Sequence, residues 1–468
     1  MPEQKSIPTR ETIHGRAEGR RRRAEYPRKD LAILGDRHAD FDPVATLDEQ
    51  ARGRVESLLP LRADRMAADE FSFLRGAAAI MAYDLAMTPS TQIDVQLCGD
   101  AHISNFGVFY SPERRLIFGL NDFDETLPGP FDWDVKRMAA SAAVALRSQG
   151  RDEAAIRKSL RRALAYYRTT ILDLATRGNM AVWYTRLDIE ANIDQLRSAF
   201  TDEHGSRVDD LVAQARRKDS RQAYNKLVGM VGSKLGFLAD PPLIVPMEQL
   251  LAEGGTGSTT EAVLDAVFEG YLASIGEAPR HLLETFERVD MARKVVGVGS
   301  VGTRCFVVLL LGRDLDDPLI LQIKEAVPSV LESHLGPDHH LTHGDRVIAG
   351  QRLLQSTPDL FLGAFRAQYG ETEFHDFYVR QFHDGKASAD LSVIDSTKIF
   401  TRYVQVCAWT LARAHARSGN RAALAAYVGQ SSVFEEAVTE WALAYAERNA
   451  QDYAMFVASR THDATASA

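Results

Sequence analysis

The sequence contains few cysteines and no long apolar run. Its three cysteines, Cys98, Cys305 and Cys407, have no metal-binding spacing and are too few for a disulfide framework. No apolar run reaches the roughly 18 residues that a membrane-spanning helix requires, and no apolar segment follows the basic stretch near the N-terminus. We therefore expect neither a transmembrane helix nor a signal peptide, which predicts a cytoplasmic protein without a membrane partner.

An excess of positive charge is also absent. The formal net charge is −9, whereas a nucleic-acid-binding protein normally carries a basic excess, so we expect no nucleic-acid partner. Apolar residues make up 45% of the chain and charged residues 25%, which are ordinary values for a globular protein. With 468 residues the chain is long enough for a large core and for two or three domain-sized units.

Acidic and amide side chains gather around a predicted β-hairpin. Two short apolar segments, Phe106–Tyr110 and Arg115–Leu120, flank a Ser-Pro-Glu-Arg turn. Asn105 precedes the first strand and Asp122 follows the second, so the hairpin brings these side chains together, with Asp124 close by. Such oxygen ligands suit Mg²⁺, which takes one or two carboxylates together with substrate phosphates. Asp and Asn also favour turns, so a polar hairpin is the alternative; the Asp-Phe-Asp sequence at this distance favours the metal site.

A further acidic residue, Asp100, lies five positions before Asn105 and has no obligatory metal role. It is free to orient or deprotonate a hydroxyl, as the base aspartate of a phosphoryl-transfer site does. His102 either contacts the transferring phosphate or holds the loop through a structural hydrogen bond. Arg75, in a predicted helix over residues 66–86, either reaches a phosphate or braces this loop, and we favour bracing.

A glycine-rich stretch forms the second candidate motif. Gly297, Gly299 and Gly302 form GxGxxG, with Ser300 among them. The dinucleotide-binding version of this pattern requires a helix after it, but the segment that follows, Cys305–Leu311, is strand-like. A glycine-rich turn between two strands is instead typical of the loop that covers the phosphates in kinases.

The strand after this turn, Leu319–Lys324, ends in a lysine, as does the kinase strand that carries the phosphate-binding lysine. We therefore expect Lys324 to hold the α- and β-phosphates of a nucleotide. The alternative is an ordinary lysine at the end of a strand. An acid should position this lysine, and Glu332 is the first candidate; a predicted helix over Val347–Gln355 competes for that place but offers Gln351 instead of an acid.

A further strand, after the three around the glycine turn and the lysine, is predicted at Phe377–Phe382. The backbone of this strand around Val379 and Gln381 is a candidate for the hinge that receives the adenine.

Two motifs resemble those of a known enzyme superfamily. CGDAHISN, which begins at Cys98, resembles the HGDxHxxN catalytic loop of aminoglycoside phosphotransferases and related protein-kinase-like enzymes, and NDFDETLPGPFDWD, which begins at Asn121, resembles their metal-binding segment. Together with FLRGAAAIMAYDL, GQRLLQ, FYVRQ and LARAHARSG, they are similar to an uncharacterised bacterial family, domain of unknown function 2252, from Arg16 to Gly419. The resemblance implies ATP and Mg²⁺ as cofactors, with Mn²⁺ as a substitute.

The order of the motifs differs from that of ordinary kinases, because here the glycine loop and the lysine follow the catalytic loop. We therefore expect an α+β, protein-kinase-like two-lobe fold that is circularly permuted, with a mostly helical large lobe and a small antiparallel β-lobe. The alternative is that the glycine hairpin is unrelated to nucleotide binding. The predicted division is a loosely structured basic segment (1–43), a helical catalytic lobe (44–290), the β-lobe (291–385), C-terminal helices packed on the large lobe (386–457) and a disordered tail (458–468).

The function predicted from these residues is Mg-ATP-dependent transfer of a phosphoryl group to a hydroxyl of an unknown small-molecule or protein acceptor. A silent nucleotide-binding pseudokinase or scaffold, AMP transfer, and a metal-dependent phosphohydrolase are the alternatives. The presence of Asp100, Asn105, Asp122 and Lys324 together favours an enzyme, because a protein that only binds a nucleotide needs no base.

Overall fold

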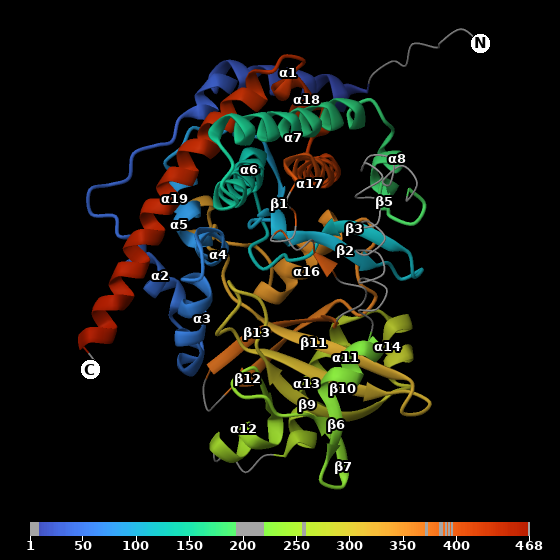
Figure 1. Ribbon diagram of the computed structural model, residues 1–468. Helices are drawn as coiled ribbons and strands as arrows, with labels where there is room; N and C mark the ends of the chain where they lie inside the picture. Colours follow the sequence, from blue (N-terminus) through green and yellow to red (C-terminus); the bar gives the residue numbers. More distant parts are fainter. Residues whose placement is uncertain are drawn as a thin grey trace.

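The computed structural model describes residues 9–192, 220–254, 259–369, 373–382, 387–388, 391, 394 and 396–466. The fold is α+β, and Figure 1 shows two parts one above the other. The helical part comprises residues 9–192 and 396–466. The sheet part comprises the described residues between 220 and 382 and contains a six-stranded antiparallel sheet. The expected mixture of helices and antiparallel sheets is confirmed.

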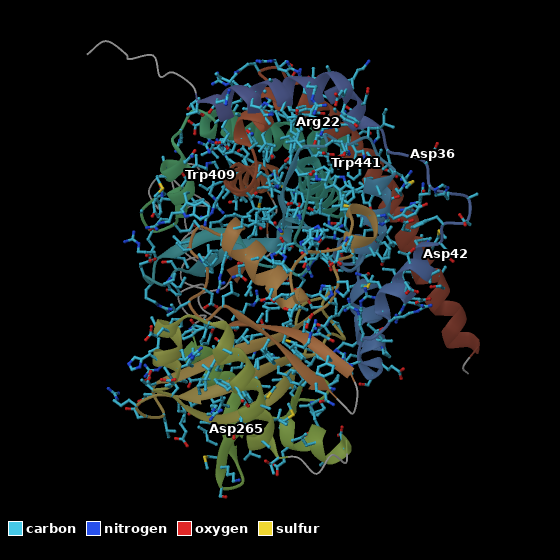
Figure 2. All side chains as sticks on the ribbon, turned by 180° about the vertical axis from the view of Figure 1, so that it is seen from behind. Arg22, Asp36, Asp42, Asp265, Trp409 and Trp441 are labelled. Atoms are coloured by element: carbon cyan, nitrogen blue, oxygen red, sulfur yellow. The ribbon has the colours of Figure 1, made fainter. Side chains whose placement is uncertain are left out.

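The helical part is built around α6 (Phe131–Ser148), which is buried along almost its whole length. Its small side chains let α7 (Glu153–Leu174), α17 (Thr397–Ser418) and α19 (Val433–Ala466) pack against it. Trp441 of α19 is fully buried in this core, and Figure 2 shows it from behind. The other helices of this part are α1 (Arg10–Glu25), α2 (Pro43–Ala51), α3 (Leu59–Met66), α4 (Glu70–Gly76), α5 (Ala78–Ala86), α8 (Asn179–Tyr184) and α18 (Arg421–Val428).

The two ends of the chain are more ordered than the sequence suggests. The N-terminal segment was predicted to be loosely structured, but α1 is a four-turn helix that packs on α18, as Figure 1 shows. A Cβ at Gly19 would lie 2.1 Å from the carbonyl oxygen of Ala423, so this close approach requires glycine. At the other end, α19 continues to Ala466, where a disordered tail was predicted from residue 458.

The predicted hairpin is confirmed. It consists of β2 (Phe106–Tyr110) and β3 (Leu116–Leu120), and Phe106 pairs with Leu120. Two shorter strands, β1 (Asp94–Leu97) and β4 (Leu127–Pro130), pair with each other. Because β1 leads into the loop around Asp100 and β4 follows the Asp-Phe-Asp sequence, this pairing places the two segments side by side. The hairpin is flanked by β5 (Leu187–Asp188) and β14 (Ala387–Ser388).

The sheet part has the strand order β12-β13-β11-β10-β9-β8, and every neighbouring pair is antiparallel. The three strands predicted around the glycine turn and the lysine are present as β9, β10 and β11. The strands are β8 (Ile244–Pro246), β9 (Glu287–Lys294), β10 (Cys305–Leu311), β11 (Pro318–Ala326), β12 (Gly363–Tyr369) and β13 (Glu373–Gln381).

Both faces of this sheet are covered. On one face α13 (Thr260–Ser274) contributes Phe268 and Tyr271 to an apolar cluster, and on the other α11 (Ser220–Leu227) packs through Leu227. Residues 220–290 had been assigned to the helical lobe, but they belong to the sheet part because their apolar faces are buried on the sheet. The remaining elements here are β6 (Val228–Val231), β7 (Lys234–Phe237), α12 (Met247–Gly254), α14 (Glu277–Leu283), α15 (Glu332–Leu335) and α16 (His343–Leu354).

A buried ion network joins the segment after α1 to α5 and α19. The Asp84 carboxylate on α5 is fully buried and accepts two hydrogen bonds from Arg37, at 2.7 and 2.6 Å, and one from Arg448 of α19 at 3.2 Å. Arg37 also donates to Asp452 of α19. Removing one member leaves an uncompensated charge in the core, which costs more than an exposed ion pair contributes.

We expect the substitution Asp84→Asn to lower the free energy of unfolding by about 3–5 kcal/mol, because Arg37 and Arg448 would lose the fully buried carboxylate that both of them bind. Urea denaturation followed by circular dichroism measures this. The control is Glu153→Gln, which removes the exposed pair with Arg157 and should cost less than about 1 kcal/mol. Equal losses in the two variants would contradict the structural importance of the network.

Candidate active site

A cleft of about 480 Å³ lies between the helical part and the sheet part. It is lined by all of the residues that the sequence nominated except Gly302, Glu332 and Val379. The lining residues from the nominated set are Asp100, His102, Asn105, Asp122, Asp124, Gly297, Gly299, Ser300, Lys324 and Gln381. Segments far apart in the sequence therefore meet at one place.

The catalytic loop is held by the first turn of α6. The carboxylate of Asp134 accepts hydrogen bonds from the backbone N–H groups of Cys98, at 2.7 Å, and Gly99, at 3.0 Å. Its Oδ2 also lies 3.2 Å from Nε2 of the buried His415. A charged acceptor with several donors is rigidly placed, so the backbone immediately before Asp100 has little freedom.

The side chain of Asp100 is oriented by Arg137, a residue that sequence reasoning missed. Arg137 is 3% exposed, and its Nε donates to Oδ1 of Asp100 at 2.8 Å. The same guanidinium donates to the carbonyl oxygen of Leu74 at 2.8 Å. Oδ2 of Asp100 remains on the cleft side, 3.6 Å from Nε2 of His102. This leaves one carboxylate oxygen fixed and the other available to a hydroxyl.

His102 is buried and neutral. Burial lowers its pKa to about 4, against the opposing effect of the nearby Asp100. An imidazole with this pKa carries no charge at neutral pH, so it does not act as a cation towards a phosphate. Among the described residues the side chain of His102 makes no hydrogen bond: its Nδ1 is buried without a partner and its Nε2 lies 3.6 Å from Oδ2 of Asp100, so both expected roles stay predictions.

Asn105 lies beside Asp122, as the hairpin predicted. Its amide nitrogen donates to the backbone carbonyl oxygens of Asp100, at 3.0 Å, and Asp122, at 3.1 Å. These bonds fix the plane of the amide, and its oxygen accepts no hydrogen bond from the part of the chain that the structure describes. That oxygen is the group of Asn105 that can coordinate a cation.

Lys324 bridges the two parts of the molecule. Its ammonium group contacts Asp124 directly and lies 3.6 Å from Asp122, and its side chain is 2% exposed. Burial lowers the pKa of Lys324, but the carboxylates of Asp122 and Asp124 outweigh burial and raise it above the ordinary value. The hydroxyl of Tyr378, on β13, donates to the other oxygen of Asp124 at 2.8 Å.

The prediction that Glu332 positions Lys324 was wrong. Glu332 accepts a hydrogen bond from the backbone N–H of Ser329 at 2.8 Å and lies 3.7 Å from Arg346. The chain turns away from Lys324 directly after β11, so α15 stands outside the cleft. The acids that neutralise the lysine come instead from the Asp-Phe-Asp segment. Gln351, the competing candidate, hydrogen-bonds within its own helix.

The predicted adenine hinge is also corrected. Val379 is fully buried and pairs with strands on both sides, because β13 lies inside the sheet. Gln381 does line the cleft, but its backbone N–H donates to Asp359 at 2.6 Å. Neither residue presents a free backbone donor to the cleft.

The glycine loop is tied to the helical part. Gly302 has φ +92°, which favours glycine, and its position faces Arg54 and not the cleft. Val298 packs against an apolar cluster formed by α2, α3, α4 and α5. Four hydrogen bonds between described residues cross this contact. Nη1 of Arg54 donates to the carbonyl oxygens of Gly299 and Val301. Nη1 of Arg65 donates to the carbonyl oxygen of Gly297, and the backbone N–H of Val55 donates to the carbonyl oxygen of Gly302. The sequence did not reveal the role of Arg54, because 245 residues separate Arg54 from Gly299 and no local pattern connects the two positions.

Arg75 does not brace the loop around Asp100 through a side-chain hydrogen bond or ion pair, contrary to the favoured prediction. Its guanidinium lines the cleft, and the structure gives it no hydrogen bond or ion pair with a described residue. The backbone of Arg75 instead lies against the glycine loop, since a Cβ at Gly299 would lie 3.2 Å from the carbonyl oxygen of Arg75.

Glu125 lies at the back of the acidic cluster. One of its carboxylate oxygens accepts a hydrogen bond from the backbone N–H of Val330 at 2.8 Å. Burial raises its pKa to about 7, the Val330 N–H and Arg346 oppose this, and the negative charges of Asp124 and Asp100 add to it. Glu125 is therefore partly protonated near neutral pH.

Metal sites of the usual protein-only kind are not found. In the described ranges no group of three or more His, Cys, Asp or Glu side chains is arranged to hold a metal ion. Any cation in the cleft would rely on Asn105, Asp122 and Asp124 together with oxygens of a substrate. Among the helices that the structure describes, none is long and apolar enough to span a membrane.

Comparison with known proteins gives one match. A family model described as "Uncharacterized protein conserved in bacteria (DUF2252)" matches residues 54–459, which is most of the chain and includes every residue that lines the cleft except Gln50. This match confirms the family resemblance inferred from the motifs. No curated protein and no solved structure matches the chain.

We expect the free energy of unfolding of the wild type, minus that of Glu125→Gln, to fall as pH rises from about 4.5 to about 7. In this window the folded protein retains the Glu125 proton while the unfolded chain has lost it, so raising the pH favours unfolding. Urea midpoints measured in EDTA across this range test the prediction, with Glu153→Gln as an exposed control. A wild-type to Glu125→Gln difference that stays constant or rises with pH would contradict it.

Proposed function

The chain belongs to the DUF2252 family of bacterial proteins, and we propose that it is a Mg²⁺- and ATP-dependent phosphotransferase with a hydroxyl compound as acceptor. One observation carries the proposal: a single cleft combines Asp100, Asn105 and Asp122 with Lys324 and the glycine loop. This is the combination of a base, two metal-binding residues, a phosphate-binding lysine and a phosphate-covering loop that phosphoryl transfer uses.

The side chains present fit Mg²⁺. The ammonium group of Lys324 already lies against Asp122 and Asp124, which indicates that these carboxylates face a common position suited to positive charge. Asn105 would add its amide oxygen, and substrate phosphates would complete the set. When bound, Mg²⁺ supplies neutralisation of the charge on the phosphates.

The cleft also fits a nucleoside triphosphate. Gly297 has φ +69°, and the loop from Gly297 to Ser300, in which Val298 has the largest side chain, forms part of the cleft wall. Lys324 lies opposite that loop, so its charge is available to the α- and β-phosphates once the carboxylates hold the metal. Phe382, from the end of β13, lines the cleft and offers an apolar surface to a base.

The chemistry required of the chain itself is limited. Asp100 would accept a hydrogen bond from the acceptor hydroxyl and receive its proton as the new O–P bond forms. The bond between the γ-phosphorus and the β,γ-bridging oxygen breaks, and ADP leaves. Arg137 keeps Asp100 in place, so most of the rate enhancement comes from positioning and charge neutralisation.

We further propose that the molecule is a circularly permuted, protein-kinase-like two-lobe enzyme. The support is the order β9, glycine loop, β10, β11 with Lys324, α16, β12 and β13, which is the order of elements in the small lobe of kinases. In this chain that series follows the catalytic loop. AMP transfer would use the same groups, and the mass of the product separates it from phosphoryl transfer.

A thermal titration tests this function. At a hundred times its dissociation constant, ATP with Mg²⁺ should stabilise the wild type by about 2.7 kcal/mol, which raises the melting temperature by about 3 °C for a chain of this length. We expect Asp122→Ala and Lys324→Ala to lose the shift, because each removes a charge that binds the nucleotide or its metal. Asp100→Asn should keep the shift and lose turnover.

The matched control is Asp265→Ala on α13, an exposed aspartate that does not line the cleft and that Figure 2 labels at the lower end of the molecule; this variant should behave as the wild type. A shift that is lost in Asp122→Ala but retained in Lys324→Ala would refute the role of the sheet part in nucleotide binding. No shift in the wild type would refute the ATP site itself.

A further inference from the structure

Arg75 is a fixed arginine whose charged end has no partner. It lies on the last turn of α4, and the carbonyl oxygens on either side of it are held: that of Leu74 by Arg137, at 2.8 Å, and that of Gly76 by Arg62, at 3.0 Å. Its own carbonyl lies against Gly299 of the glycine loop. The backbone of Arg75 is therefore immobilised on three sides, which also restricts where its side chain can reach.

The guanidinium of Arg75 has no direct partner among the described residues. It makes no hydrogen bond and no ion pair with any residue in the described part of the chain, and its Nε is buried. Burial lowers the pKa of Arg75 below its ordinary value, which reports the cost of holding this charge away from water. By contrast, Arg137 and Arg54, its neighbours at the cleft, are both fully engaged with carboxylate or carbonyl oxygens.

The acids near Arg75 do not explain its presence. Asp100 faces it, but one oxygen of Asp100 is already bound by Arg137. Asp69 also faces it, but both of its oxygens accept hydrogen bonds from Ser72 at the start of α4. A half-buried arginine that no described residue binds directly is suited to an anion that arrives from outside, and its planar donors match a phosphate or a carboxylate.

The position of Arg75 indicates which anion. The charged groups that face it are Asp100, Asp69 and Arg137, whereas those that face Arg54 are Glu125, Asp124 and Glu325. Arg54 is thus on the side of the metal-binding carboxylates and the nucleotide phosphates. Arg75 is on the side of the base, where an acceptor hydroxyl would lie.

We propose that Arg75 binds an anionic group of the acceptor, so that the acceptor is a hydroxyl compound that also carries a phosphate or a carboxylate. This inference rests on the proposed phosphotransferase function, because Asp100 identifies the acceptor side. The acidic net charge of the whole protein does not oppose it, because the guanidinium of Arg75 makes no ion pair with a described residue.

Calorimetric titration of the full chain tests the inference. Mg²⁺ and the non-hydrolysable analogue adenylyl imidodiphosphate are added first, so that the γ-phosphate position is filled, and inorganic phosphate or acetate is then titrated. We expect the wild type to bind at least one of these anions, with phosphate favoured if the acceptor is a phosphate ester and acetate if it is a carboxylate. Arg75→Gln should weaken this binding about tenfold or more, and Arg75→Lys should retain part of it.

The controls separate this role from others. Arg52→Gln, which removes an exposed arginine near the cleft, should bind the anion as the wild type does. Arg75→Gln should keep its affinity for the nucleotide analogue and should melt no lower than the wild type, because no described contact is lost. A lower melting temperature with unchanged anion binding would show that Arg75 is structural and overturn the proposal.

Other results have equally definite meanings. Loss of analogue affinity in Arg75→Gln would assign Arg75 to the nucleotide and overturn the proposal. Analogue binding without any anion binding in the wild type would overturn it while leaving the phosphotransferase function intact. Anion binding that depends on Arg75 without any analogue binding would retain the anion subsite and refute the phosphotransferase function.

Discussion

The arrangement of the cleft depends on the contact between Lys324 and the carboxylates of Asp122 and Asp124. The lysine comes from the sheet part and the acids from the helical part, so this charge pairing joins the two parts at the cleft. A lysine as buried as this one is stable only with acids beside it, and Tyr378 completes the set by donating to Asp124. The two carboxylates are therefore held beside each other by a cation of the protein itself.

The sequence was most informative where the relevant residues are close together in the chain. The hairpin from Phe106 to Leu120, the three strands around the glycine turn and the position of Asn105 beside Asp122 all follow from spacing, alternation and turn composition. The sequence was least informative about side-chain contacts between residues that lie far apart in the chain. Neither Arg137, which orients Asp100, nor Arg54, which binds the glycine loop, carries a local pattern that reveals it, because each contact joins residues that only the fold brings together.

The errors have the same physical origin. The sequence of a strand shows which side chains alternate between its two faces, but it does not show which strands lie beside it. Val379 was therefore predicted to belong to a hinge, although β13 pairs with a strand on each side. Helix α1 is charged around most of its surface, which is typical of a solvated segment, and only its glycines reveal the face that packs on α18. The acidic partner of Lys324 was predicted among the residues that follow the lysine in the chain, within the sheet part. In the structure the partners are Asp122 and Asp124, which precede the lysine in the chain and belong to the helical part.

The attachment of the glycine loop has a mechanical consequence. Because the loop is hydrogen-bonded to Arg54, Val55 and Arg65, the sheet part is fastened to the helical part at the rim of the cleft as well as at its floor, where Lys324 lies. The two parts consequently cannot swing apart like a simple hinge. Either the fastening breaks whenever a bulky molecule passes, or helices α2 to α4 travel with the loop as a single rigid flap.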